Sequence, residues 1–258
     1  WPRAATPIWR GVSGCAARQS PAVPPPTCLS RCRPTANTVV ESLPEPCLCL
    51  VTDRTVTSGD LVERVTEAVL GGVDLVQLRE KDLSKERLLE LAGTLLEAIG
   101  GRAKMIVNER ADVAFAAGAQ GVQLGEAGQP VSAARKILGS GALIGRSVHS
   151  LQSAAQAEAD GADFLLVGTM FASRSHPGEA PAGSGLMREV SANSRLPIIG
   201  IGGITPENAV EVIEAGASGV AVITNILVAQ DPKAAAAKLK EAICEAWWVS
   251  EKPARQSF

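Results

Sequence analysis

The chain has 258 residues and lacks any apolar run long enough to cross a membrane, although 46% of its residues are hydrophobic. A membrane-spanning helix needs about 20 mostly apolar residues. Acidic residues are absent from residues 1–40, which hold five arginines; removing those charges from the formal net charge of −2 leaves −7 for residues 41–258. An acidic body argues against nucleic-acid binding, so we expect neither a membrane nor a nucleic acid as partner.

The spacing of the six cysteines also does not predict a zinc site or a set of disulfides. Cys28 and Cys32 have no second pair of ligands at zinc spacing. Cys47 and Cys49 alternate on an apolar stretch, where cysteine behaves as a small hydrophobic residue. We therefore expect no structural metal centre.

Residues 1–46 show no sustained helical or strand period and are rich in Pro, Arg, Ser and Ala. Such a segment is typical of disorder. Its arginines and serines resemble an organellar transit peptide, which would place the mature protein in a plastid. Alternatively, the reading frame extends upstream of the true start, since no Met precedes Met105. In that case we expect a cytoplasmic protein.

From residue 47 onward the sequence alternates between short apolar runs and amphipathic stretches. A helix-ending glycine, a small residue and an apolar strand recur four times, beginning at Gly72, Gly118, Gly161 and Gly216. Glycine suits such helix ends because it takes the left-handed conformation without strain. The predicted strands are 47–52, 73–79, 104–108, 121–124, 142–147, 163–168, 197–201 and 218–223. The predicted helices are 58–71, 84–99, 109–117, 131–139, 150–160, 184–193, 206–215 and 232–247.

Most of these strands are apolar along their whole length, which is typical of a parallel sheet that is buried on both faces. Eight βα units favour closure into a single (β/α)₈ TIM barrel of the α/β class. The alternative is a doubly wound sheet, which usually carries a glycine-rich dinucleotide loop after its first strand, whereas this chain has Thr52-Asp53-Arg54 there. We expect the barrel to span 47–248, followed by a flexible tail over 249–258.

In a barrel of this kind the active site lies at the carboxyl ends of the strands. The second strand ends in Gln77-Leu78-Arg79-Glu80-Lys81. Because side chains alternate along a strand, Gln77 and Arg79 share the inner face. Arg79 is expected to bind a carboxylate or phosphate, with Lys81 as a mobile charge, or else to form an internal ion pair with Asp53 or Glu109.

The segment IIGIGGI over 198–204, followed by Thr205-Pro206, is the strongest local signal. Two glycines between a strand and a helix expose backbone N–H groups to an anion, and barrels commonly bind phosphate after strands seven and eight. We expect Gly202 and Gly203 to bind phosphate. A tight turn with no ligand is the alternative.

The chain contains only two histidines, His149 and His176. Imidazole titrates near neutral pH and is the usual proton shuttle in enzymes. His149 follows the fifth strand directly, so we expect it to be the acid–base residue, although it could instead point to solvent beside a helix cap. His176 lies in the long 173–181 loop, which we expect to act as a lid.

These residues resemble the superfamily of thiamine phosphate synthase and its relative thiazole tautomerase (TenI). The resemblance covers nearly all of residues 47–246. Its motifs are QLREKD (77–82), VNERADVA (107–114), GVQLG (121–125), IGRSVHSL (144–151), GADFLLVGTMF (161–171), IIGIGGITPENA (198–209) and GVAVITNI (219–226).

The resemblance implies an enzyme that acts on a phosphorylated thiazole, and two activities remain open. Synthases hold Mg²⁺ with two aspartates, whose positions correspond here to Glu109 and Gly128, with Glu126 nearby. Mg²⁺ demands near-octahedral geometry, which these changes suit poorly. The synthase loop also becomes Ser173-Arg174-Ser175-His176, without its lysine.

We therefore expect a thiazole tautomerase with His149 as acid and base and with no cofactor. The alternative is a thiamine phosphate synthase, which joins aminopyrimidine pyrophosphate to thiazole phosphate and uses Mg²⁺. A non-catalytic barrel that binds such phosphates is a third reading. The remaining implied substrate contacts are Asn108, Ser147, Ser173, Ser175, Thr224 and Asn225. Barrels of this type often pair, so a homodimer is an open expectation.

Overall fold

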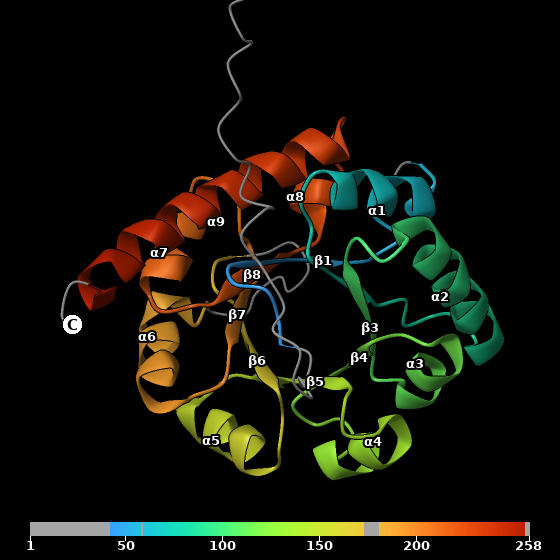
Figure 1. The fold of residues 1–258 in the computed structure, drawn as a ribbon, viewed down its shortest axis with the longest axis horizontal. Coiled ribbons are helices and arrows are strands. Elements are labelled where there is room, and N and C mark those ends of the chain that lie inside the picture. The colour runs from blue at the N-terminus through green and yellow to red at the C-terminus, as the bar shows by residue number, and fades with distance from the viewer. Residues whose placement is uncertain (1–41, 58, 173–180, 256–258) are drawn as a thin grey trace, which may run out of the picture. The chain divides into compact units, whose positions relative to one another are not determined.

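The computed structural model describes residues 42–57, 59–172 and 181–255. Eight parallel strands alternate with helices along the chain and close into a barrel, in which β8 pairs with β1 (Figure 1). The predicted (β/α)₈ barrel is confirmed. The strands are β1 Cys47–Val51, β2 Leu75–Leu78, β3 Lys104–Asn108, β4 Gly121–Leu124, β5 Leu143–Val148, β6 Phe164–Gly168, β7 Ile198–Ile201 and β8 Gly219–Val222. The helices are α1 Leu61–Leu70, α2 Lys85–Ile99, α3 Ala111–Ala117, α4 Val131–Leu138, α5 Leu151–Ala159, α6 Gly183–Asn193, α7 Ala209–Glu214, α8 Thr224–Leu227 and α9 Pro232–Arg255.

Strand side chains alternate between two apolar clusters. One cluster fills the barrel interior and includes Cys49, Leu75, Ile106, Phe164 and Ile199. The other lies between the strands and the surrounding helices. Because both faces of each strand are buried, the strands read as apolar runs in the sequence. Most polar side chains of the strands therefore lie at the strand ends.

Helix starts follow the residues that cap them. Ser84 caps α2, since its hydroxyl accepts from the Arg87 N–H at 3.4 Å, and the helix begins one residue after the predicted start at 84. The predicted start of α1 at residue 58 is wrong, because the Asp60 carboxylate accepts from Val62 N–H at 2.7 Å and the helix begins after it. Capping side chains satisfy N–H groups that have no partner within the helix.

Two further helix predictions are corrected, and one helix was not predicted. The helix predicted from 206 begins only at 209, because the Asn208 side chain accepts from Thr205 N–H and donates to the Gly203 carbonyl, which holds 205–208 in a turn. The short helix α8 was not predicted from the sequence. The last helix, predicted to end at 247, continues to Arg255.

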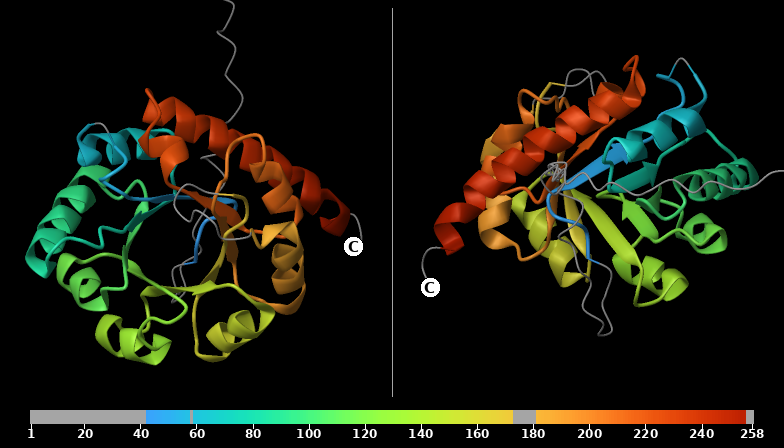
Figure 2. Two further views of the ribbon diagram at one scale, coloured as in Figure 1. Left: turned by 180° about the vertical axis from the view of Figure 1, so that it is seen from behind. Right: turned by 45° about the horizontal axis from the view of Figure 1, so that its top comes forward.

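The helix α9 attaches to the segments that precede β1 and β2. It lies along α1 and α7, as Figures 1 and 2 show. The Lys240 ammonium donates to the Pro46 carbonyl at 2.6 Å and to Asp74 Oδ2 at 2.7 Å, and Asp74 also accepts from Leu48 N–H. These bonds attach the last helix to the amino-terminal ends of β1 and β2.

The structure describes residues 42–46 of the predicted leader, where Leu43 is buried in the interior cluster. The rest of that prediction, over 1–41, and the expectations about 173–180 lie outside the described residues. In the part of the chain that the structure describes, no helix is long and apolar enough to cross a membrane.

Candidate active site

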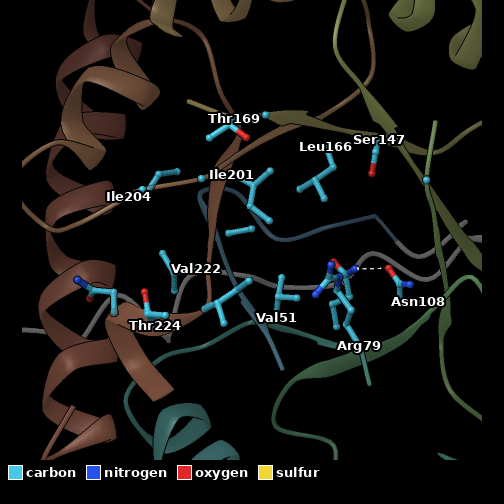
Figure 3. A pocket seen from close by; sticks show the side chains of 18 of the residues that line it. Val51, Arg79, Asn108, Ser147, Leu166, Thr169, Ile201, Ile204, Val222 and Thr224 are labelled. Carbon is cyan, nitrogen blue, oxygen red and sulfur yellow. Dashed lines mark hydrogen bonds between the residues drawn. The ribbon is translucent and has the colours of Figure 1, made fainter. Parts of the chain in front are cut away.

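A cavity of about 690 Å³ opens at the carboxyl ends of the strands, where the sequence predicted the site (Figure 3). Twelve residues singled out from the sequence line it, whereas Asp53 does not and instead accepts from Thr55. Ser173, Ser175 and His176 lie outside the described residues. The twelve are Gln77, Arg79, Lys81, Asn108, Glu109, Glu126, Ser147, His149, Gly202, Gly203, Thr224 and Asn225.

One end of the cavity is polar and is built by β2 to β5. Gln77 Nε2 donates to Asn108 Oδ1 at 3.0 Å, and only 3% of Gln77 is exposed. This bond uses the Asn108 oxygen, so the Asn108 amide hydrogens remain available to a ligand. Among the described residues, Arg79 forms no ion pair with Asp53 or Glu109, so the internal ion pair considered from the sequence is not formed.

Gln123 fixes the hydroxyl of Ser147 at the same end. Gln123 is 1% exposed, and its Nε2 donates to Ser147 Oγ at 3.1 Å and to the Leu124 carbonyl at 3.2 Å. The space for this side chain comes from Gly145, where a Cβ would lie 2.1 Å from Gln123 Oε1. Because Ser147 accepts this bond, its own O–H is free to donate to a ligand.

His149 and Glu126 form a pair at the rim of this polar end. His149 Nδ1 lies 2.8 Å from Glu126 Oε2, and the two side chains are 56% and 42% exposed. Hydrogen bonds from the Ser153 hydroxyl and then from His149 lower the pKa of Glu126. An ionised Glu126 accepts an Nδ1 hydrogen and leaves Nε2 of His149 for exchange with a ligand.

Glu109 points from the end of β3 toward the loop that follows β4. Its φ is +60°, an unusual value for a residue with a side chain. Glu109 Oε1 accepts from Gly125 N–H at 2.5 Å. A Cβ on Gly128 would lie 2.5 Å from Glu109 Oε2, so this carboxylate occupies the space beside Gly128.

The other end of the cavity is formed by the segments after β7 and β8. Gly202 and Gly203 have φ values of +106° and +64°, which favour glycine. A Cβ on Gly203 would lie 2.6 Å from the Ala172 carbonyl. Thr224 and Asn225, which begin α8, line the same end. Backbone N–H groups and small polar side chains suit an anion here.

An apolar surface separates the two ends. Figure 3 shows Val51, Leu166, Ile201 and Val222 between Arg79, Asn108 and Ser147 on one side and Thr224 and Ile204 on the other. Flat rings can bind over such a surface while charged groups are held at its ends. The cavity therefore suits a ligand, or two ligands, with negative charge at both ends.

A family model described as thiamine monophosphate synthase (TMP-TENI) matches residues 48–226. The chain belongs to this thiamine monophosphate synthase family. The match starts within β1 and ends in α8, so it covers all eight strands of the barrel and both ends of the cavity.

Relatives of this thiamine monophosphate synthase family member carry consistent names. A thiamine-phosphate synthase of Haloquadratum walsbyi is 40% identical over 212 residues, covering 80% of this chain and 95% of the relative. A thiamine-phosphate synthase of Moorella thermoacetica is 43% identical over 188 residues, covering 72% and 89%. The solved thiamine phosphate pyrophosphorylase of Pyrococcus furiosus superposes with a TM-score of 0.71 at 34% identity, covering 78% and 96%.

These matches make the chain an enzyme of thiamine biosynthesis within this family. They support the synthase alternative better than the tautomerase expectation, because the relatives described above are synthases by name. Nothing in them links the chain more closely to the tautomerase branch.

Proposed function

We propose that this enzyme is a thiamine phosphate synthase, which joins an aminopyrimidine pyrophosphate to a thiazole phosphate. The observation that supports this best is the two-ended cavity. Arg79, Lys81 and carboxylates lie at one end, glycine N–H groups lie at the other, and an apolar surface lies between them. Two substrates with one anionic group each fit this arrangement, and about 690 Å³ is a usual size for a small-molecule site.

In this proposal the pyrophosphate binds at the polar end. Arg79 can form two parallel hydrogen bonds to phosphate oxygens, and Lys81 adds a positive charge. The thiazole phosphate binds at Gly202 and Gly203, with Thr224 and Asn225 beside it. The two rings then meet over the apolar surface, where Ser147 and Asn108 donate to ring atoms.

The reaction breaks the bond between the pyrimidine methylene carbon and the pyrophosphate oxygen, and pyrophosphate leaves with the electron pair. The thiazole nitrogen uses its lone pair to form the new carbon–nitrogen bond. Atoms and charge balance without a net proton transfer. Arg79 and Lys81 assist by stabilising the negative charge that grows on the leaving group.

Family membership implies Mg²⁺, and the cavity offers oxygen ligands for it. Mg²⁺ is usually held by one or two carboxylates together with substrate phosphates. Glu109 lines the cavity and its Oε1 accepts from Gly125 N–H, so a carboxylate with the donor chemistry that Mg²⁺ needs lies at this end. The ion, when bound, neutralises charge on the pyrophosphate, and Glu109 is the residue that would hold it.

The test is an assay of the purified chain with both substrates, measuring thiamine phosphate and pyrophosphate. We expect equal amounts of the two products, loss of activity with chelator and recovery with Mg²⁺. Arg79→Met should lower activity by about 10-fold or more. Condensation that persists without divalent cations, or no condensation at all, would contradict the proposal.

A second candidate is thiazole tautomerase, and the His149–Glu126 pair is the observation that favours it. The carboxylate fixes the imidazole so that His149 can remove a proton from the ring and return one to the side-chain carbon.

His149→Asn separates the two candidates, with Ser150→Ala as a control on the neighbouring helix cap. A tautomerase should lose about 10²–10⁴-fold in rate with the first variant, as expected for a general acid–base residue. A synthase should keep its condensation activity in both variants.

A further inference from the structure

A side-chain hydroxyl holds the main chain at Arg79. Strands β1 and β2 pair in parallel, and just beyond β1 the Thr52 N–H donates to the Gln77 carbonyl at 2.9 Å. In a parallel ladder the next bond would run from Arg79 N–H to a main-chain carbonyl. Here Arg79 N–H donates to the Thr52 hydroxyl oxygen at 2.9 Å. A substitution at Thr52 can therefore remove the acceptor that holds Arg79, which is not possible for a main-chain carbonyl.

Glu80 sets the direction of this hydroxyl. Its carboxylate accepts a bond from the Thr52 hydroxyl and two from Arg54 N–H, at 3.1 and 3.2 Å. Thr52 is 0% exposed and Glu80 is 5% exposed, so both are shielded from water. A hydroxyl has one hydrogen to donate. Because that hydrogen goes to Glu80, the lone pairs of Thr52 Oγ are left to accept from Arg79 N–H.

The same contacts direct Glu80 away from the two cations beside it in the sequence. Arg79 and Lys81 line the cavity, whereas Glu80 does not. The cation that lies beside Glu80 is Arg54, whose Nε is 3.8 Å from Glu80 Oε2. Figure 3 shows the Arg79 side chain pointing into the cavity. The positive charges of Arg79 and Lys81 are therefore presented to a ligand, while the negative charge between them is buried outside the cavity lining.

We infer that Thr52 is a positioning residue for pyrophosphate binding: its hydroxyl, oriented by Glu80, fixes the main chain at Arg79 and so directs the guanidinium into the polar end of the cavity. This inference rests on the proposed synthase function, which supplies the pyrophosphate. A guanidinium forms two parallel bonds to a phosphate only when the two groups are aligned. A displacement of about 1 Å in a positioning contact can cost about 10²-fold in rate.

Calorimetry on the full chain with pyrophosphate plus Mg²⁺ measures this role. Thr52→Val keeps the branched side chain but removes the acceptor for Arg79 N–H. We expect it to weaken pyrophosphate binding by about 10-fold or more and to leave thiazole phosphate binding within about 3-fold. Thr52→Ser keeps the hydroxyl, so its pyrophosphate binding should stay within about 3-fold of the wild type. Pyrophosphate binding that is unchanged in Thr52→Val, or equally weakened in Thr52→Ser, would overturn the inference.

Arg79→Met tests whether Thr52 acts through Arg79. In that background Thr52→Val should weaken pyrophosphate binding by less than about 2-fold, because no guanidinium is left to direct. If Thr52 only stabilised the fold, Thr52→Val would weaken binding by the same factor in both backgrounds, and that result would overturn the inference.

Thr66→Val is the matched control. It removes a hydroxyl that donates to the Val62 carbonyl within α1 at 2.7 Å, and Thr66 does not line the cavity. Pyrophosphate binding should therefore equal that of the wild type. Thermal melting of each variant establishes that it folds.

Glu80→Gln gives a second measurement, which decides the question if Thr52→Val does not fold. The amide keeps the size of the side chain but has only one acceptor oxygen, so it holds the Thr52 hydroxyl less firmly. Loss of a negative charge near the anion would by itself tighten pyrophosphate binding. Weaker binding, by about 3-fold or more, is therefore expected only if Glu80 acts by orienting Thr52. Unchanged or tighter binding would overturn the inference.

The binding measurements also keep this inference separate from the proposed function. Pyrophosphate binding that depends on Thr52, without condensation, would refute the synthase proposal alone. Condensation with pyrophosphate binding that does not depend on Thr52 would refute the inference alone.

Discussion

Glu80 is a buried carboxylate at the end of β2, next to the cavity but not part of its lining. It is 5% exposed and accepts two hydrogen bonds from Arg54 N–H, at 3.1 and 3.2 Å. Burial raises the pKa of Glu80, although bonds from the Thr52 hydroxyl and the Arg54 N–H act in the opposite direction. The residue ties the segment after β1 to the end of β2.

This raised pKa predicts how stability changes with pH. The folded state holds the Glu80 proton more tightly than the unfolded state, so its contribution to the free energy of unfolding is complete below pH 4.5, the ordinary pKa, and is lost as pH rises through the folded pKa. Relative to Glu80→Gln, the wild type should lose stability in urea unfolding as the pH rises above 4.5.

The matched control is Glu86→Gln in the first turn of α2. A backbone hydrogen bond to its own N–H lowers the pKa of Glu86, so the stability it adds is present above its ordinary pKa and is lost as pH falls. The two variants should therefore show opposite slopes. Parallel slopes would contradict the assignment to Glu80.

At the residue scale, the sequence could predict which side chains face the cavity but not how they contact one another. Gln77 and Arg79 share a face because strand side chains alternate. The bond from Gln77 to Asn108 joins two strands, and no local pattern encodes it. The direction of Glu109 depends on its φ of +60°, which nothing in the residue type favours. The resemblance paired positions 109 and 128, but the contact of the Glu109 carboxylate with Gly128 could not be predicted from the sequence.

At the scale of elements, all eight strands could be predicted because each is a short apolar run bounded by glycine or polar residues. Helix starts were less certain, since capping depends on side-chain bonds such as that of Asp60 to Val62 N–H. The four residues of α8 are too few for a helical period to be recognised. The last helix extends beyond residue 247 because residues 248–252 contain no proline or glycine to end it.

The contact between α9 and the start of the barrel yields a prediction at this scale. Lys240 and Asp74 are bonded at 2.7 Å, with side chains 22% and 19% exposed. Lys240→Met should lower the free energy of unfolding by about 1–3 kcal/mol, because it leaves the Asp74 carboxylate partly buried without its cation. Urea unfolding measures the change.

Two further variants control this prediction. Adding Asp74→Asn to Lys240→Met should recover part of the lost free energy of unfolding, since the amide that replaces the Asp74 carboxylate is neutral. Lys238→Met on the same helix breaks an ion pair with Glu207 whose side chains are 65% and 68% exposed, and it should change the free energy of unfolding far less, because solvent screens this pair. If Lys238→Met and Lys240→Met lowered the free energy of unfolding equally, burial would not explain the effect of Lys240→Met.

At the scale of the whole barrel, the two ends of the cavity come from opposite halves of the chain. Elements β2 to β5 supply the polar end, and the segments after β7 and β8 supply the glycine end. Side chains that share no partners have independent effects. A substitution at one end of the cavity should therefore weaken only the ligand that binds at that end.

Calorimetry with pyrophosphate plus Mg²⁺ and with thiazole phosphate tests this independence. Arg79→Met should weaken the first ligand by about 10–100-fold and leave the second within about 3-fold. Gly203→Ala should do the reverse, because its Cβ would meet the Ala172 carbonyl at 2.6 Å. Weakening of both ligands by either variant would show that they share one subsite.

The pairing of β8 with β1 also sets an order for folding during synthesis. A ribosome makes β1 first, and until Gly219–Val222 emerges, β1 has an open edge that can pair with another chain. The bonds from Lys240 to Pro46 and Asp74 come later still. A chain truncated before β8 therefore keeps an unpaired edge at β1, and we expect it to aggregate where the full chain stays monomeric or closed.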